Sequence, residues 1–188
     1  PTVVASYILG GGGFTSRLTT RVRSDEGLAY SVYSFAGSDY DDIAGSGVAL
    51  QTKVESAVFA LKIIFEEIRK LAEQGPTPQE LESAKQSLIE SLPGLFDSPH
   101  ATAELFAQSE IWGRSLDHFK NYPEEIRRVT ADDVRRCIRQ YFAPERMTVS
   151  IAGPVQSILA TDSVRGMRLQ DLGLGEPQLV PLDSLELR

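Results

Sequence analysis

An arginine and a tyrosine seven positions apart are the residues of this sequence best suited to chemistry. Arg23 lies near the end of a predicted helix and Tyr30 near the start of the strand that follows, with Gly27 between them. A guanidinium and a phenol both donate hydrogen bonds, and either can polarise a carbonyl or stabilise a developing oxyanion. Arginine near a helix C-terminus also favours the helix dipole, and tyrosine is common in strands. The spacing alone leaves both interpretations open.

Four consecutive glycines, Gly10 to Gly13, precede this pair. Backbone amides at a helix N-terminus bind anions, so a phosphate site is one interpretation. No lysine follows in the P-loop spacing, no G-x-G-x-x-G pattern begins at Gly10, and no predicted βαβ unit surrounds the run. We therefore expect a hinge between two helices that allows close backbone packing, with nucleotide binding as the weaker hypothesis.

Residues that commonly bind catalytic metals or act as nucleophiles are scarce. The chain has two histidines, His100 and His118, and neither H-E-x-x-H nor H-x-x-E-H occurs. A catalytic zinc generally needs three closely held protein ligands, so we expect no metal site in this chain. Cys137, the single cysteine, cannot form an internal disulfide, and in a predicted helix it is interpreted as a partly buried structural thiol.

The composition is that of an ordinary soluble globular domain, with 41% hydrophobic and 24% charged residues in 188. A formal net charge of −7 argues against a general nucleic-acid binder, because phosphate neutralisation needs a basic surface. No apolar run approaches the roughly 20 residues that cross a bilayer, so we expect no membrane span. Since the first residue is Pro1 rather than methionine, we expect a piece of a longer or processed protein whose compartment stays open.

The elements that must position Arg23 and Tyr30 follow from hydrophobic periodicity and glycine positions. A short apolar helix is predicted over residues 2–9, ended by the glycine run, and a second begins at a Thr15 or Ser16 cap and stops at Gly27. Residues 28–36 are predicted to be a strand that pairs with a strand at 43–51 through a polar turn at 38–42. The result is an antiparallel hairpin.

The rest of the chain is mainly helical in pattern. Apolar residues recur every three or four positions from Val54 to Leu71, which predicts a long amphipathic helix that stops at Gly75-Pro76. A capping box at Thr77-Pro78-Gln79-Glu80 opens a helix to about Leu92, and Pro93-Gly94 breaks the chain. Further helices are predicted over residues 101–112, 117–124 and 131–142.

A final core strand is predicted where Met147, Val149 and Ile151 alternate with polar residues. From residue 155 to 188 the pattern ends, and this tail is expected to wrap the domain, add an edge strand or act as a linker. Strands followed by a helical block and another strand predict an α+β fold. Its architecture is expected to be a two-layer α/β sandwich with a mainly antiparallel sheet packed on helices, formed by residues 1–154.

The stretch I-L-G-G-G-G-F-T-S-R-L, followed by R-S-D-E-G-L-A-Y-S-V-Y-S, resembles the second half of a pitrilysin or insulinase-type zinc peptidase of the bacterial processing-peptidase-like branch. In this family two similar halves enclose an extended peptide. The first half carries a zinc-binding H-x-x-E-H, and the second carries an arginine and a tyrosine that match Arg23 and Tyr30. The resemblance also implies that residues 1–154 lack the strand that relatives have before the first helix.

The resemblance implies a division of labour between the halves. A zinc-bound water, activated by a glutamate of the partner half, attacks the peptide carbonyl, while Arg23 and Tyr30 bind the substrate backbone and stabilise the oxyanion-like intermediate. This half is then expected to be inactive alone and to hold no cofactor. Its expected partners are a peptide substrate and the zinc-bearing half, which is either part of the same parent chain or a separate subunit of a homo- or heterodimer.

Two further implications of the resemblance concern specificity and role. Asp25 and Glu26 stand where relatives often carry basic residues, which bears on the charge preference for substrate. Some relatives have lost catalysis and serve as structural subunits, so a non-catalytic assembly role is the alternative. The bacterial branch implies the cytoplasm or the periplasm.

Overall fold

A two-stranded antiparallel hairpin forms the sheet within the part of the chain that the computed structural model describes, residues 1–37, 45–115, 117–160 and 165–180. Strand β1 (Ala29–Ala36) pairs with β2 (Ser46–Thr52) in a register that runs from Ala29 opposite Thr52 to Ala36 opposite Ser46. Both predicted strands are confirmed, although the second begins at Ser46. The predicted turn at 38–42 lies outside the described residues.

The N-terminal helix runs further into the glycines than the sequence predicts. Helix α1 (Thr2–Ser6) continues as a wider π-helical turn, η1 (Tyr7–Gly11), and the Gly12 amide donates to the Tyr7 carbonyl at 2.8 Å. After a 3-10 turn, η2 (Gly13–Thr15), the second helix begins at Ser16, whose carbonyl accepts from the Thr20 amide at 3.0 Å. Of the two residues that the sequence offers as a cap, Thr15 and Ser16, the structure therefore starts the helix at Ser16.

The second helix is mostly π-helical, η3 (Thr19–Asp25), and it ends at Gly27 as predicted. Gly27 has φ +62°, a left-handed conformation that glycine adopts without a Cβ penalty. The Leu28 amide then donates back to the Val22 carbonyl at 2.9 Å. This turn sends the chain directly into β1, so it fixes the position of Arg23 relative to the strand.

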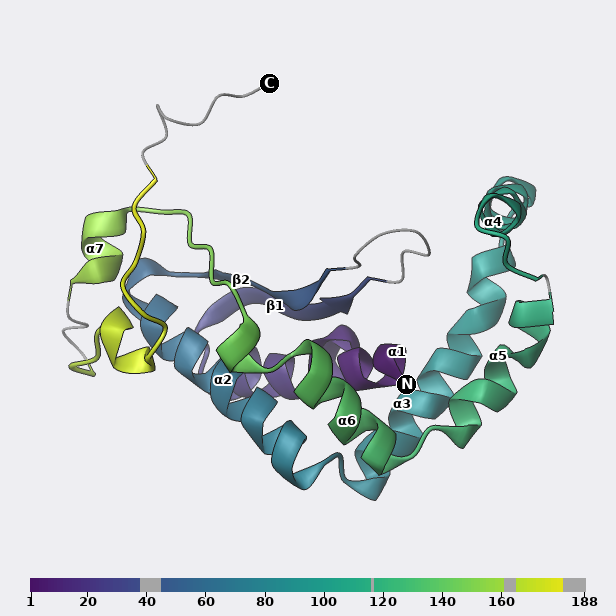
Figure 1. The fold of residues 1–188 in the computed structure, drawn as a ribbon, viewed down its shortest axis with the longest axis horizontal. Helices are drawn as coiled ribbons and strands as arrows, with labels where there is room; N and C mark the ends of the chain where they lie inside the picture. Colours follow the sequence, from purple (N-terminus) through teal and green to yellow (C-terminus); the bar gives the residue numbers. More distant parts are fainter. Residues whose placement is uncertain (38–44, 116, 161–164, 181–188) are drawn as a thin grey trace.

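Helices cover one face of the hairpin (Figure 1). The long amphipathic helix is confirmed as α2 (Ala57–Gln74), preceded by the 3-10 turn η4 (Val54–Ser56), and it packs against α6 (Ala131–Tyr141), which also contacts α1. The sheet packed on helices confirms the predicted α+β fold. The most deeply buried large side chains come from η1, α2 and α6 and from the residues that flank η3 and α6: Leu9, Leu18, Ile63, Ile68, Leu71, Ile138 and Phe142.

Three helices form an arm that projects from the sheet layer (Figure 1). Helix α3 (Pro78–Ser91) starts at the predicted capping box, in which the Glu80 amide donates to Thr77 Oγ1 at 3.2 Å. The 3-10 turn η5 (Leu92–Phe96) replaces the predicted break, and α4 (Pro99–Ile111) and α5 (Asp117–Arg128) follow. Within this arm, the ring centres of Phe96, Phe106 and Phe119 lie 5.5 to 6.4 Å from one another.

The predicted final strand is wrong. Met147 has extended backbone angles, and burial alternates from Met147 to Ser150, but these residues belong to no ladder within the described chain. From Thr148 to Gly153 no backbone–backbone hydrogen bond is formed with any described residue. Met147 and Val149 are partly buried, as the alternation predicted, but Ile151 is exposed. A strand also needs a neighbouring backbone, which the described residues do not supply.

The described part of the tail lies against the domain. Helix α7 (Val155–Leu159) buries Ile158, and Leu172 in the short turn η7 (Leu169–Leu172) packs on the core together with Leu174. The Arg165 guanidinium lies 4.2 Å from the centre of the Phe59 ring of α2. Among the helices described here, none has both the length and the apolar composition that a membrane crossing would require.

Candidate functional site

Arg23 lies on the last turn of η3 with its side chain at the surface. Its guanidinium carbon is 5.0 Å from the centre of the Phe14 ring, which is 74% exposed. This cation–π contact restrains the guanidinium while leaving its N–H groups available at the ring's edge. The two residues line a shallow pocket of about 200 Å³ together with Gly10, Gly11, Ser31 and Tyr33.

Tyr30 lies in a β-bulge near the start of β1. Ala29 is opposite Thr52 and Ser31 is opposite Gln51, so Tyr30 has no residue of β2 opposite it. Strict alternation with the buried Val32 would turn Tyr30 toward the core, yet its side chain is 83% exposed. A bulge redirects a side chain in this way. Within the described residues the phenol has no hydrogen-bond partner, so its hydroxyl is available to a ligand.

Arg23 and Tyr30 are joined by no hydrogen bond or cation–π contact in the described chain. Ser31, next to Tyr30, lines the Arg23 pocket, but Tyr30 does not. Two more aromatic side chains, Tyr33 and Phe35, are 51% and 46% exposed on the same strand. We call the four exposed aromatic side chains of this region, Phe14, Tyr30, Tyr33 and Phe35, the aromatic surface.

Sequence reasoning did not single out Phe14, Tyr33 or Phe35. The period-2 spacing of Tyr33 and Phe35 against the small, buried Ser34 was the available signal, because it puts both rings on the solvent face of the strand. The bulge at Tyr30 left no comparable pattern in the residue types.

The glycine run allows a helix backbone to touch a strand. A Cβ at Gly10 would lie 2.4 Å from the Ser34 backbone nitrogen, and the Ser34 hydroxyl donates to the Ser6 carbonyl at 2.7 Å. The expectation of close backbone packing is confirmed. Because the Gly12 amide already donates to Tyr7, it is not free for an anion, which weighs against the phosphate hypothesis.

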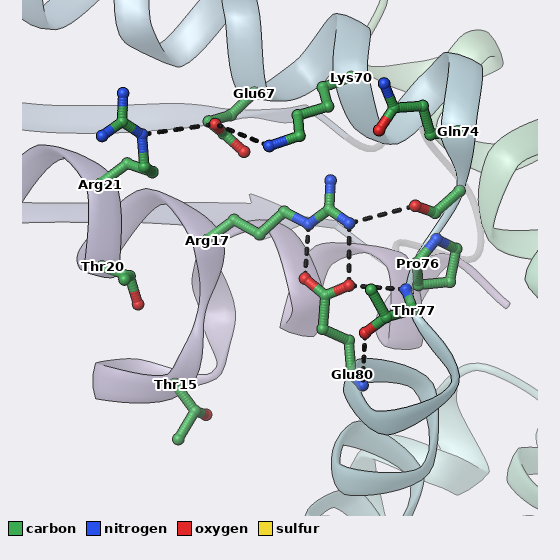
Figure 2. A pocket seen from close by; sticks show the side chains of 11 residues that line it. Thr15, Arg17, Thr20, Arg21, Glu67, Lys70, Gln74, Pro76, Thr77 and Glu80 are labelled. Carbon is green, nitrogen blue, oxygen red and sulfur yellow. Dashed lines mark hydrogen bonds and ion pairs between the residues drawn. The ribbon is translucent and has the colours of Figure 1, made fainter.

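A larger hollow of about 500 Å³ lies where η3 meets the junction of α2 and α3 (Figure 2). Arg17 binds Glu80 there in a bidentate manner, with Nε 2.6 Å from Oε1 and Nη2 2.8 Å from Oε2, and Nη2 also donates to the Gly75 carbonyl at 3.1 Å. Burial raises the pKa of Glu80, but hydrogen bonds from Arg17 and from the Thr77 amide outweigh it and lower the pKa to about 2.

The charges of this hollow pair with one another. Arg21 lies 3.6 Å from Glu67 on α2 and 3.6 Å from each of Asp25 and Glu26. Arg21 therefore offsets part of the acidic character that the sequence assigned to residues 25 and 26. We call the Arg17–Glu80 and Arg21–Glu67 ion pairs of this hollow the brace, and we interpret them as the contacts that hold η3 on the α2–α3 junction. Sequence reasoning missed Arg17 because its partner is 63 residues away.

The candidate metal ligands of the chain are apart from one another. In the ranges that the structure describes, no group of three or more histidine, cysteine, aspartate or glutamate residues is placed to hold a metal. The His118 ring instead packs edge-on against Phe119 and Tyr122 at 5.4 and 6.0 Å. Cys137 is 7% exposed, 3.8 Å from Thr2 Oγ1, as expected of a structural thiol. These residues do not fit a catalytic zinc.

Residues 1–88 match the model of the family described as "Peptidase M16 inactive domain". Over residues 1–88, the chain is therefore similar to a peptidase M16 inactive domain. The resemblance stated from the sequence is thereby confirmed. A protein of Streptomyces coelicolor named as an uncharacterized zinc protease is 33% identical over 147 residues, covering 78% of this chain and 31% of that protein.

Two further proteins are similar to this chain. The crystal structure of a peptidase M16 inactive domain from Pseudomonas fluorescens superimposes with a TM-score of 0.65 at 26% identity, over 74% of this chain and 33% of that one. A non-peptidase homologue from Helicobacter pylori is 40% identical over 92 residues, 48% of this chain and 20% of that protein. The chain therefore spans about a third or less of the curated relatives that it matches.

Proposed function

We propose that this M16 inactive domain is the substrate-binding and transition-state-stabilising half of a two-half zinc metallopeptidase that cleaves extended peptides. The observation that carries this proposal is that the Arg23 guanidinium, held on Phe14, and the exposed Tyr30 hydroxyl form no hydrogen bond with the described residues. Relatives from Streptomyces coelicolor and Bacillus subtilis are named as uncharacterized zinc proteases, which supports the same class of enzyme. Zinc and its H-x-x-E-H belong to a separate half, since the described residues of this chain do not fit the metal.

The chemical task of this chain is then to hold and polarise a peptide. The Arg23 guanidinium, held on Phe14, donates to backbone carbonyls of the substrate, and the Tyr30 hydroxyl donates to the oxygen that gains negative charge. The aromatic surface supplies apolar area for substrate side chains. Loss of one donor to an oxyanion typically costs on the order of 3 kcal/mol of transition-state stabilisation.

The test uses this chain together with its zinc-bearing half in a peptidase assay. Tyr30→Phe removes one hydroxyl and keeps the ring, so we expect turnover to fall about tenfold or more with an unchanged melting temperature. Arg23→Ala should also weaken peptide binding, because a cationic donor contacts the ground state as well. Tyr141→Phe, an exposed tyrosine of α6, is the matched control and should leave turnover unchanged. Unchanged turnover in both site variants would end the catalytic assignment.

A non-catalytic role in an assembly is the second candidate, and the non-peptidase homologue from Helicobacter pylori is the observation that favours it. In that case neither the parent gene nor a neighbouring one should encode an H-x-x-E-H segment. Arg23 and Tyr30 variants would then change assembly or stability rather than peptide hydrolysis. Finding H-x-x-E-H in either place supports the peptidase.

A further inference from the structure

Arg23 differs from the two arginines before it in what holds its side chain. A carboxylate of α3 lies 2.6 Å from Arg17, and a carboxylate of α2 lies 3.6 Å from Arg21. Arg23 forms no ion pair and no hydrogen bond with the residues that the structure describes, and its guanidinium carbon instead lies 5.0 Å from the centre of the Phe14 ring. An aromatic face therefore holds this arginine where carboxylates hold the other two.

The kind of partner decides whether an arginine is still able to bind a substrate. A carboxylate neutralises the guanidinium charge and accepts from the N–H groups that a peptide carbonyl would need. An aromatic face attracts the same charge through its quadrupole and leaves the N–H donors free. It also restrains a long side chain that otherwise loses conformational entropy on binding. The contact with Phe14 is thus suited to an arginine that acts on a ligand.

The glycine run fixes the point from which the Phe14 ring projects. A Cβ at Gly12 would lie 2.7 Å from the ring of Tyr7, so a glycine lets this turn pack against the first helix. The Gly13 carbonyl accepts from the Ser16 hydroxyl at 2.8 Å and from the Ser16 amide at 3.2 Å, which ties the same turn to the start of the second helix. Because the second helix carries the arginine, the turn sets the place of the ring relative to the guanidinium.

We propose that Phe14 is a positioning residue for Arg23 and that the glycine run serves peptide hydrolysis by placing this ring. The inference rests on the proposed function, in which the Arg23 guanidinium donates to substrate carbonyls. The ring holds the guanidinium in the orientation that binding needs, so it contributes through Arg23 and not by contact with the reacting atoms. The glycine run then has a role in the reaction without binding an anion.

Two substitutions at Phe14 separate the aromatic face from the apolar bulk of the side chain. Phe14→Leu keeps an apolar side chain and removes the π face, whereas Phe14→Trp supplies the face that attracts cations best. In the assembled enzyme of two halves, we expect Phe14→Leu to lower kcat/KM about two- to fivefold, the range of an exposed cation–π contact. Phe14→Trp should keep kcat/KM at or above that of the native chain. Since the ring is 74% exposed, neither variant should change the melting temperature.

The same variants in an Arg23→Ala background test whether the ring acts through the arginine. If it does, all three side chains at position 14 should give equal kcat/KM once the guanidinium is absent, because the ring then has nothing to hold. A ring that contacted the substrate directly, or that supported the fold, would keep its effect in this background. A difference between the leucine and tryptophan variants that persists without Arg23 would therefore overturn the proposal.

A second measurement uses the 188-residue chain alone and does not depend on activity. The ring current of Phe14 should shift the Arg23 Nε–H resonance upfield in the NMR spectrum. Phe14→Leu should remove this shift, and Phe14→Trp should retain it. A native chain whose Arg23 resonance is the same as that of Phe14→Leu would show that the ring does not hold the guanidinium, and the proposal would be wrong.

These outcomes separate the inference from the proposed function on which it rests. If Arg23→Ala lowers turnover while Phe14→Leu and Phe14→Trp give equal kcat/KM, the role of Phe14 alone is wrong. If Arg23→Ala leaves turnover unchanged, Arg23 has no task in the reaction, and the roles of both residues are wrong.

Discussion

The two edges of the hairpin differ in how they are covered. On β1, the residues that direct backbone groups away from β2 are Val32 and Ser34. The Thr19 hydroxyl lies 3.5 Å from the Val32 carbonyl, and Gly10 packs directly against the Ser34 nitrogen. We call this the covered edge. The β2 edge instead faces a hollow of about 830 Å³. Residues close in sequence therefore cover one edge of the sheet, whereas no described strand pairs with the other.

A side chain added at Gly10, the closest contact of the covered edge, should destabilise the fold. Gly10→Ala places a Cβ 2.4 Å from a backbone nitrogen that cannot move aside easily, so we expect a loss of roughly 1–3 kcal/mol in the free energy of unfolding. Gly94→Ala is the matched control, since a Cβ there meets nothing within 4 Å, and it should be close to neutral. Chemical denaturation measures both. Equal stabilities would mean that the edge is not covered in this way.

The brace that holds η3 over the covered edge should depend on pH. The folded-state pKa of Glu80 is about 2 against an ordinary value of 4.5, so its contribution is complete above about pH 4.5 and is lost as pH falls toward 2. Glu80→Gln should cost about 1–3 kcal/mol at neutral pH and flatten this part of the stability curve.

Glu82→Gln serves as the control for this measurement, because Glu82 is an exposed neighbour that binds Lys85 at 3.0 Å. It should change the stability little at any pH. If both variants show the same acid profile, the Arg17–Glu80 pair does not anchor η3.

The open edge should tolerate a change that a paired strand would not. Ser150→Pro removes one N–H from a segment that makes no backbone–backbone hydrogen bond with the described residues, so we expect a change within about 0.5 kcal/mol in thermal or denaturant unfolding. A large loss of stability in the isolated chain would show that residues 148–153 are already paired.

The elements predicted most completely from the sequence are those formed by interactions between residues that are close together in the chain. The α2 stripe, the Thr77 cap and the Gly27 stop each depend on residues within one or two helical turns, and the structure confirms all three. Arg23 was likewise placed correctly at a helix end. Its functional role stays a prediction, as does that of Tyr30.

The features that the sequence did not reveal depend on distant partners. Arg17 and Glu80 meet only through the fold, and the Tyr30 bulge arises from the register between two strands. Met147 to Ile151 has the composition of a strand, but pairing is a property of two backbones. A periodic pattern reports which side of a segment is buried and not what lies beside it.

The burial of Cys137 between α6 and the start of α1 has a practical consequence. It is the chain's one cysteine, so a thiol reagent added to the native protein has a single place to react. The Cys137 thiolate reacts only when it is exposed to solvent. The labelling rate therefore measures the frequency of local opening between α1 and α6. Since α1 leads into the glycine run, that rate measures how often α1 and η1 together separate from the rest of the domain.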